Sequence, residues 1–353
     1  MAINPSIGLV GLALQSARDE AAKQPTYVHG LTGGSPFSAS RSIENTPVAC
    51  GTRAPSDARV DTIEVGANVE SLCYPDALGL YLYAALGSVT TTAVVDKSGY
   101  FQHVFRMGDK LPYLTFWSQV GVDNFTRTDG CKCSKLTFNA TGNKHLAMTG
   151  TFVGIDAQVG IDGIPGHVAA SCYGGKYTTT DCEFRLDAAS ETPTDALVSE
   201  ASFTIANGTS ALTSLGRVTP RDIADGNLSF GCSVTTIPDD ITQYKKMVTG
   251  SKTSNAITGK VVMGSVYAKF LHTDDPNMTL EFSVGHVPFT ADYPSVDPEG
   301  DEGTIQFTAD AAIITAAGES PATITLVNKV ASYVGSAVSD GHSSAGMAVK
   351  AVK

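Results

Sequence analysis

Short segments that alternate apolar and polar residues recur along most of this chain. A period of two is typical of strands that bury one face of a sheet. The pattern predicts strands at residues 60–72, 100–107, 113–120, 132–139, 145–153, 202–206, 227–236, 261–271, 278–287, 304–315 and 322–330. Between two of them, residues 140–143 read Ala-Thr-Gly-Asn, which suits the turn of an antiparallel hairpin.

Two short segments carry helix signals instead. The first, residues 75–87, starts with a Pro-Asp pair and closes on glycine, and the second, residues 238–249, starts in the same way and is followed by glycine. The apolar positions of each fall on one stripe. We therefore expect each helix to cover one face of a sheet.

The two helical segments also match each other residue by residue. Without a gap, Pro75, Asp76, Leu78, Tyr81, Ala85, Gly87 and Ser88 correspond to Pro238, Asp239, Ile241, Tyr244, Val248, Gly250 and Ser251. Flanking residues agree as well: Gly66, Val69, Phe105 and Asp109 correspond to Gly231, Val234, Phe270 and Asp274. Chance similarity of two strand-to-helix units is one explanation. Agreement outside the helices favours duplication, and two similar domains suggest a ring of three copies with pseudo-sixfold symmetry.

These patterns divide the chain into five parts. We expect an N-terminal arm and long loop at 1–60 that belongs to the first domain, a first β domain at 61–154, a glycine-rich linker and inserted loop at 155–198, a second β domain at 199–331 and a C-terminal tail at 332–353. The apolar residues 7–14 lack a preceding Lys or Arg, so we interpret them as part of a mature arm and not as a signal peptide.

Composition and charge limit the classes of function. The chain has 24 Lys and Arg against 35 Asp and Glu, a formal charge of -11, and no dense basic run. Tight binding of nucleic acid requires cationic contacts to phosphate, so it is not expected. An acidic surface does suit a passage through which a polyanion slides. No apolar run reaches the roughly 18 residues of a membrane-spanning helix.

Seven cysteines at irregular spacing indicate reduced thiols made in a cytoplasm, with a single Cys172–Cys182 bridge as the open alternative. Cys131 and Cys133 resemble half of a metal site, but no second ligand pair lies near them in the sequence. Because alternate positions on a strand share a face, we interpret these two as core thiols.

Other candidate chemistry is equally sparse. Surface or structural roles are expected for the scattered histidines, His29, His103, His145, His167, His272, His286 and His342. The glycine-rich residues 160–166 do not lead from a strand into a helix, so they do not predict a phosphate loop. The acidic run Asp297, Glu299, Asp301 and Glu302 lacks the spacing of a calcium loop and is interpreted as solvated. We predict no catalytic, cofactor-binding or metal site, and no enzyme.

Much of the chain resembles the tail tube proteins, or major tail proteins, of long-tailed bacteriophages. The resemblance is clearest at residues 63–71 and 74–87, and continues at 100–105, 114–116, 135–138, 148–154, 202–208, 220–223 and 244–250. The arm at 1–60 and the interval 155–198 show no such likeness.

The resemblance implies a fold and a function. The fold is mainly β, with two similar antiparallel β-sandwich or open-barrel domains, each with one short helix. The function is that of a structural virion protein, which self-assembles into stacked rings and forms the hollow tube for genome delivery. Inner sheets would join between copies, and rings would stack through residues 1–60 and 332–353.

The resemblance also implies partners and a location. The partners are other copies of the chain, the tape-measure protein, the tail terminator and distal tail proteins, with transient passage of double-stranded DNA and no membrane insertion. The location is the virion tail, assembled in the host cytoplasm. The alternative from another class is a two-domain β-sandwich adhesin or receptor-binding module, which the single Trp117 supports only weakly.

Overall fold

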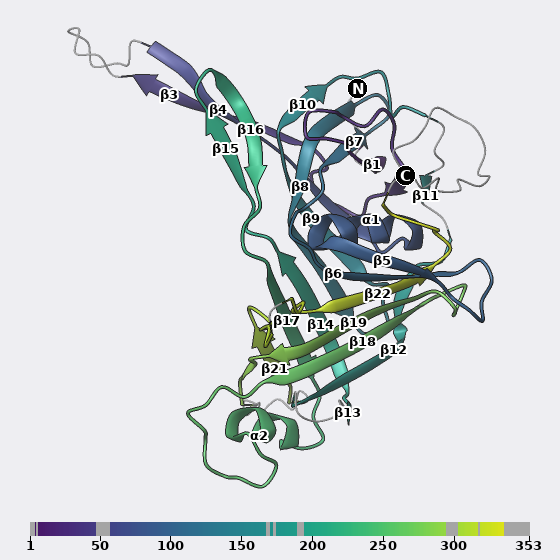
Figure 1. Ribbon diagram of the computed structural model, residues 1–353, viewed down its shortest axis with the longest axis vertical. Helices are drawn as coiled ribbons and strands as arrows, with labels where there is room; N and C mark the ends of the chain where they lie inside the picture. The colour runs from purple at the N-terminus through teal and green to yellow at the C-terminus, as the bar shows by residue number, and fades with distance from the viewer. Residues whose placement is uncertain are drawn as a thin grey trace, which may run out of the picture.

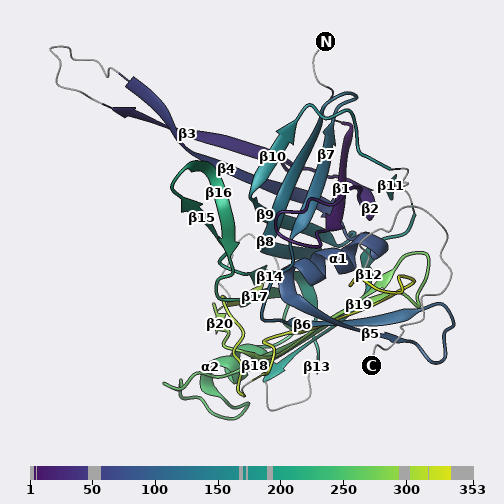
Figure 2. The same ribbon diagram turned by 45° about the horizontal axis from the view of Figure 1, so that its top comes forward.

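The computed structural model describes residues 4, 6–46, 57–166, 170–171, 174–188, 194–293, 303–316 and 318–334 (Figures 1 and 2). The helices are α1 (Pro75–Leu86) and α2 (Thr242–Thr249). The strands are β1 (Gly8–Leu14), β2 (Tyr27–Gly30), β3 (Ser38–Thr46), β4 (Asp57–Leu72), β5 (Gly87–Ala93), β6 (Phe101–Met107), β7 (Leu114–Val120), β8 (Phe125–Thr141), β9 (Ala147–Gly154), β10 (Asp156–Val159), β11 (Ala170–Ser171), β12 (Tyr177–Ala188), β13 (Thr194–Asp195), β14 (Val198–Ala206), β15 (Ser210–Ser214), β16 (Arg217–Ala224), β17 (Ser229–Thr236), β18 (Gly264–His272), β19 (Thr279–Val287), β20 (Thr290–Ala291), β21 (Ile305–Ala309) and β22 (Thr323–Asn328).

Two large sheets form an open sandwich. One sheet runs β11-β2-β1-β7-β8-β14-β17-β21-β20, with β9, β4 and β3 continuing from β8 on another path. The other runs β13-β12-β18-β19-β22-β6-β5. Among the described strands, every pairing is antiparallel except the short one between β11 and β2. The predicted fold class, a mainly β antiparallel sandwich with two short helices, is confirmed. No helix among the described residues has the length and hydropathy needed to cross a membrane.

Helix α1 lies between the two sheets. It contacts β8 and β14 of the first sheet and β5, β6 and β22 of the second. Nine of its residues are buried, on nearly every side of the helix. The prediction that α1 has a single apolar stripe is therefore wrong. The helix has neighbours on both sides, and such a helix is apolar nearly all round. Gly87 ends the helix with the left-handed φ of 80° that glycine adopts readily.

Helix α2 is shorter and more exposed than α1. It begins at Thr242 and not at Pro238, because the Asp240 carboxylate accepts a hydrogen bond from the Thr242 backbone N–H at 2.7 Å and holds a turn before the helix. Only Lys246 and Met247 of this helix are buried. The Lys246 ammonium lies 2.5 Å from the buried carboxylate of Asp187, which ties α2 to β12.

Two segments that the sequence assigned to arm or loop contain strands. In the N-terminal arm, β1 pairs with β7 along its whole length and buries Val10 and Leu12 completely. Within 155–198, β12 is a 12-residue strand that pairs with β18. Both predictions of irregular structure are corrected here. In these two pairings the partners lie between 76 (Ala188 and Gly264) and 112 (Gly8 and Val120) residues apart, so local sequence carried little sign of the pairing.

Strand pairing also crosses the boundary predicted between the two domains. β8 pairs with β14 in one sheet, and β6 pairs with β22 in the other. Phe282 of the second segment also packs on Phe138 of the first, with 5.2 Å between ring centroids. The domains at 61–154 and 199–331 remain a prediction, but in the described residues neither segment completes its sheets alone.

Asn328 connects α1, β6 and the end of the described chain. Its side-chain amide donates to the Pro75 carbonyl oxygen at 2.8 Å and to the Tyr333 hydroxyl oxygen at 2.6 Å. Its side-chain oxygen accepts from His103 Nε2 at 3.1 Å and from the Val330 N–H at 3.0 Å. Asn328 is fully buried, so its loss would remove one buried hydrogen-bond partner from each of these groups.

Replacing Asn328 with Ala should destabilise the protein by about 2–4 kcal/mol, because several buried polar groups would lose their partners. Urea unfolding followed by tryptophan fluorescence measures this effect. The control is Asn255→Ala in an exposed loop, which should leave the unfolding midpoint unchanged. Equal midpoints for the two variants would contradict the role given to Asn328.

Candidate assembly surface

Six neighbouring strands of the first sheet, β4-β9-β8-β14-β17-β21, expose a polar face. Their register places Asn139, Ser202, Ser233 and Thr308 in one row across four strands. We call this side of the sheet the hydroxyl face and define it by Asn68, Glu70, Lys135, Thr137, Asn139, Thr149, Thr151, Glu200, Ser202, Thr204, Ser233, Thr235, Gln306 and Thr308. Only Glu70, Lys135 and Glu200 carry charge, so the face is polar but almost neutral.

Side chains of the hydroxyl face bond to one another across strands. Ser202 Oγ donates to Asn139 Oδ1 at 3.0 Å, and Gln306 Nε2 donates to Ser233 Oγ at 3.2 Å. The Thr137 and Thr204 hydroxyls lie 3.2 Å apart. Such cross-strand pairs stabilise the sheet and occupy donors that would otherwise bind a passing polar ligand. The surface is therefore polar, and several of its side chains are already bonded to one another within the sheet.

The opposite side of the same strands is apolar. Leu136, Phe138, Phe203, Phe230 and Phe307 alternate with the residues of the hydroxyl face and are completely buried. This alternation is what fixes the register, because a shift by one residue would expose the phenylalanines. The hydroxyl face thus follows from packing of the core.

Two hairpins project from the sandwich at one end (Figures 1 and 2). The longer hairpin is formed by β3 and β4, and it exposes Ile43 and Val60. The shorter is formed by β15 and β16, which make a separate two-stranded sheet. Projecting strands of this kind are available to contact another molecule.

The base of the β15–β16 hairpin is fixed by buried polar contacts. Lys132 Nζ donates to Asp225 Oδ1 at 2.8 Å and to the Ile223 carbonyl oxygen at 3.1 Å. The Tyr113 hydroxyl donates to Asp222 Oδ1 at 2.5 Å, and burial together with this carboxylate raises the pKa of the Tyr113 phenol. The base of the hairpin is therefore held in place while its tip extends into solvent.

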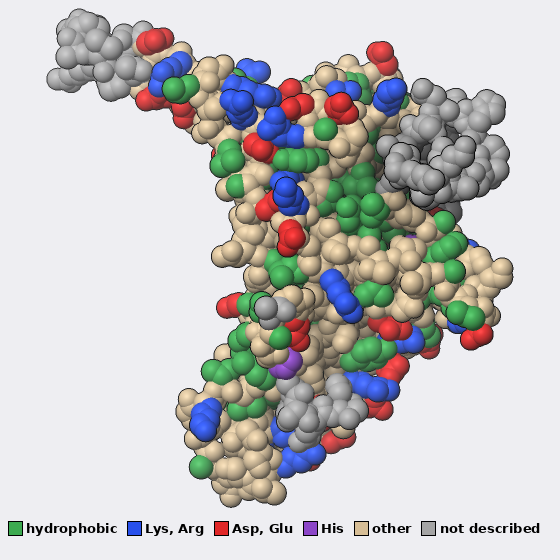
Figure 3. Space-filling model, in the orientation of Figure 1, with side chains coloured by type: hydrophobic (Ala, Val, Ile, Leu, Met, Phe, Trp, Pro, Cys, Tyr) green, Lys and Arg blue, Asp and Glu red, His purple; other side chains and the backbone are tan. Residues whose placement is uncertain are grey.

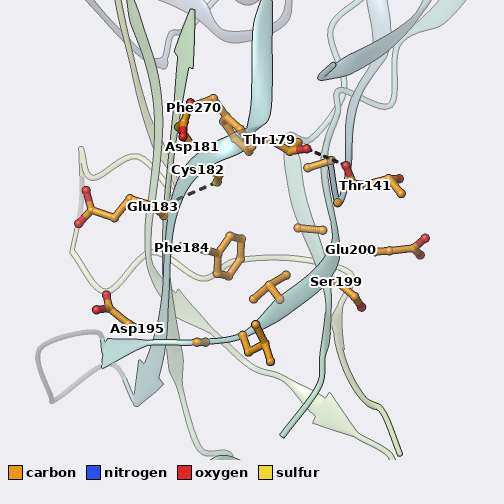
Figure 4. Close-up of a pocket in the computed structure, with 16 residues that line it drawn as sticks. Thr141, Thr179, Asp181, Cys182, Glu183, Phe184, Asp195, Ser199, Glu200 and Phe270 are labelled. Atoms are coloured by element: carbon orange, nitrogen blue, oxygen red, sulfur yellow. Dashed lines mark hydrogen bonds between the residues drawn. The ribbon is translucent and has the colours of Figure 1, made fainter. Parts of the chain in front are cut away.

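A pocket of about 480 Å³ opens near the start of β14 (Figure 4). Phe184 and Phe270 contribute aromatic surface, and Leu197 is exposed beside them. The side chain of Phe184 points into the space in Figure 4. The lining also includes four carboxylate residues and no Lys or Arg: Asp181, Glu183, Asp195 and Glu200.

The cysteines of the predicted pair are core residues. Cys131 and Cys133 lie on β8 and are completely buried, which raises the pKa of each thiol. The interpretation as core thiols is confirmed. Among the described residues, no three His, Cys, Asp or Glu side chains gather as metal ligands would. Cys182 is partly buried on β12, while Cys172 and its suggested bridge lie outside the described residues.

Three histidines have structural roles. His29 is completely buried, and its Nε2 lies 2.8 Å from the Tyr81 hydroxyl. Burial lowers the pKa of His29 to about 4, so the ring is neutral near pH 7. His103 bonds to Thr91 and Asn328, and His272 accepts from the Asp274 and Asp275 N–H groups. His145 is exposed and His286 is half-buried.

The remaining candidates add no chemistry. Residues 160–166 are a surface connection, in which Gly160 and Gly166 have left-handed φ values of 73° and 81°. The acidic run from Asp297 to Glu302, His167 and His342 lie outside the described residues. Trp117 is buried, so it does not form an exposed platform for a sugar ring. The sequence missed the hydroxyl face, although alternating Thr and Ser on β8, β9 and β14 gave a signal for it.

Replacing Asp225 with Ala should loosen the β15–β16 hairpin and destabilise the protein by about 1–3 kcal/mol, because Lys132 would stay buried without its carboxylate. Limited trypsin digestion should then cut faster at Arg217 and Arg221, read by mass spectrometry. Glu44→Ala is the control, since it removes the exposed Glu44–Arg59 pair of the other hairpin. Similar cleavage rates in the two variants would argue against this anchoring role.

Comparison with known proteins gives one family. A family model described as phage tail tube protein matches residues 9–325, from β1 into β22. A search of curated proteins finds no match. The matched range includes the hydroxyl face, both hairpins and the pocket.

Proposed function

Because this chain belongs to the phage tail tube protein family, we propose that its copies assemble into stacked rings that form the hollow conduit for genome delivery. The family places the chain in the virion tail as a structural component, a role that points away from an enzyme. The observation that best supports the finer proposal is the hydroxyl face, a broad polar surface with little charge.

In this proposal the hydroxyl face lines the tube. DNA binds tightly where cations neutralise its phosphates, and the face offers Lys135 as its one cation against Glu70 and Glu200. DNA would therefore pass without being held. The sequence suggested an acidic passage for a polyanion. In this proposal the lining is instead mostly neutral, because hydroxyl and amide groups make up most of the hydroxyl face.

Neighbouring copies would join through the edges of the open sheet. Within the described part of the chain, β21 has only the two-residue β20 beyond it at one edge, and at another edge β3 pairs with β4 alone. Unpaired N–H and C=O groups of an edge strand readily accept a strand from another chain. Such pairing would continue the wall from one copy to the next.

Stacking would use the projecting hairpins. The β3–β4 hairpin starts within the predicted stacking segment 1–60, which supports part of that hypothesis. Most of the other segment, 332–353, lies outside the described residues. We retain the ring of three copies with pseudo-sixfold symmetry as part of the proposal. The tape-measure protein, tail terminator and distal tail proteins remain the proposed partners, with assembly in the host cytoplasm.

Negative-stain electron microscopy of the concentrated protein, with native mass measurement, tests the assembly. We expect hollow rings or tubes with three chains in each layer. Six chains in each layer would agree with a conduit but would exclude the ring of three copies with pseudo-sixfold symmetry. Chains that stay monomeric even with the tail initiator complex added would contradict the proposal and favour the adhesin alternative.

Cations placed on the hydroxyl face should slow DNA passage. Replacing Ser202 and Thr204 with Lys adds two positive charges to a nearly neutral surface, and each added phosphate contact strengthens binding at low salt. Ejection of DNA from phage carrying this variant should be slower, with a delay that shrinks as salt is raised. The matched control is the Gln pair at the same positions, which adds bulk without charge. Equal delays for Lys and Gln would show that charge on this face does not matter.

A further inference from the structure

The tip of the β15–β16 hairpin presents an aliphatic side chain to solvent. Leu215 has a relative exposure of 104%, the highest among the exposed large hydrophobic residues of the described chain. Gly216, with a φ of 82°, makes the turn that puts Leu215 at the tip. Leu212 and Val218 on the same hairpin are also exposed. A grouped set of exposed apolar residues is typical of a protein contact.

The pocket near the start of β14 offers a matching apolar surface. Its volume of about 480 Å³ accommodates an aliphatic side chain between Phe184, Phe270 and Ala201. Leu197, which is 63% exposed, extends this apolar surface at the pocket. Figure 4 shows Phe184 directed into the space, while Glu200 and Glu183 extend away from it on either side.

The charges on the two surfaces are opposite. Arg217 and Arg221 are exposed on the hairpin, next to Arg18 and Asp19. Figure 3 shows Lys and Arg side chains, with some Asp and Glu among them, near this projecting end. Arg185 pairs with Glu183 and Asp195 at the pocket. Among the described residues, no ion pair includes Asp181 or Glu200. The carboxylates of Asp181 and Glu200 at the pocket are thus available to pair with Arg217 and Arg221 on the hairpin.

The two surfaces are too far apart to meet within one copy. β14 starts at the pocket with Val198 and leads toward the hairpin after Ala206. Nine extended residues span roughly 30 Å. Figure 1 places the β15–β16 hairpin toward one end of the long axis, and β13 with the start of β14 toward the other. A contact between the surfaces therefore requires a second copy.

We propose that Leu215 of one copy inserts into the pocket of a second copy, with Arg217 and Arg221 facing Asp181 and Glu200. The interface is head-to-tail, so each copy offers a tip at one end and a pocket at the other, and repetition builds an open line of copies. This inference deepens the proposed function, on which it rests, by identifying a contact between successive rings.

The first test is assembly of full-length variants, followed by light scattering and electron microscopy. Leu215→Asp should raise the concentration needed for half-maximal assembly roughly tenfold or more, because a charge replaces the buried aliphatic group. Leu215→Met should assemble as the wild type does. Val95→Asp is the matched control, since Val95 is 95% exposed on the β5–β6 turn, away from both surfaces. Wild-type assembly by Leu215→Asp would overturn the proposal while leaving the tube function intact.

A charge exchange tests the pairing of the two surfaces. Arg217→Glu and Glu200→Arg should each weaken assembly, and the double variant should recover much of it. A double variant as weak as the worse single variant would contradict the proposed orientation.

A crosslinking test does not depend on tube formation. Chains with Leu215→Cys are mixed with chains carrying Leu197→Cys and are mildly oxidised. Disulfide-linked dimers of the two kinds of chain should form, whereas Val95→Cys with Leu197→Cys should give none. Absence of the expected dimer would overturn the docking, and failure of the wild type to form tubes would count separately against the proposed function.

Discussion

Burial of α1 between two open sheets is the constraint on which the rest of the structure depends. The helix has no polar side to present to water, so it requires cover from both sides. β8 and β14 supply it from one sheet, and β5, β6 and β22 supply it from the other. Because those strands come from both halves of the chain, the helix can be buried only when the halves fold together.

This packing determines what the outer surfaces can do. Phenylalanines on β8, β14, β17 and β21 point inward, so threonine, serine and asparagine on the alternate positions point outward. The result is a broad face with hydrogen-bonding capacity but little net charge. Such a face suits contact with a moving polyanion better than capture of a ligand. The same sheet leaves edge strands with little cover, which suits growth by addition of further copies.

Assembly also requires a direction. The chain has projecting hairpins at one end and a pocket at the other, and the hairpin base is rigid because Lys132 and Tyr113 hold its aspartates. A rigid base costs less entropy when the tip is bound. Because the two ends of each copy differ, further copies can always be added and an open line forms. A self-complementary surface would instead be fully used in a dimer.

The sequence by itself determined the fold class, α1 with its glycine stop, the approximate position of α2 and most of the longer strands. These features depend on local patterns, namely alternation of apolar residues and the distinctive backbone preferences of proline and glycine. Cys131 and Cys133 were also recognised as core residues, because their spacing places both on one side of a strand. Scattered stretches of such patterns also carried the resemblance by which the sequence indicated the tail tube protein family.

Only the tertiary structure decided the places of β1 and β12, the sharing of sheets between halves, the hydroxyl face and the pocket. Strand pairing joins residues far apart in the chain, and the energy of each pair depends on a partner that local sequence does not specify. Ser202 and Asn139 illustrate this: each is an ordinary polar residue alone, and together they form part of a surface only after β8 and β14 align in register.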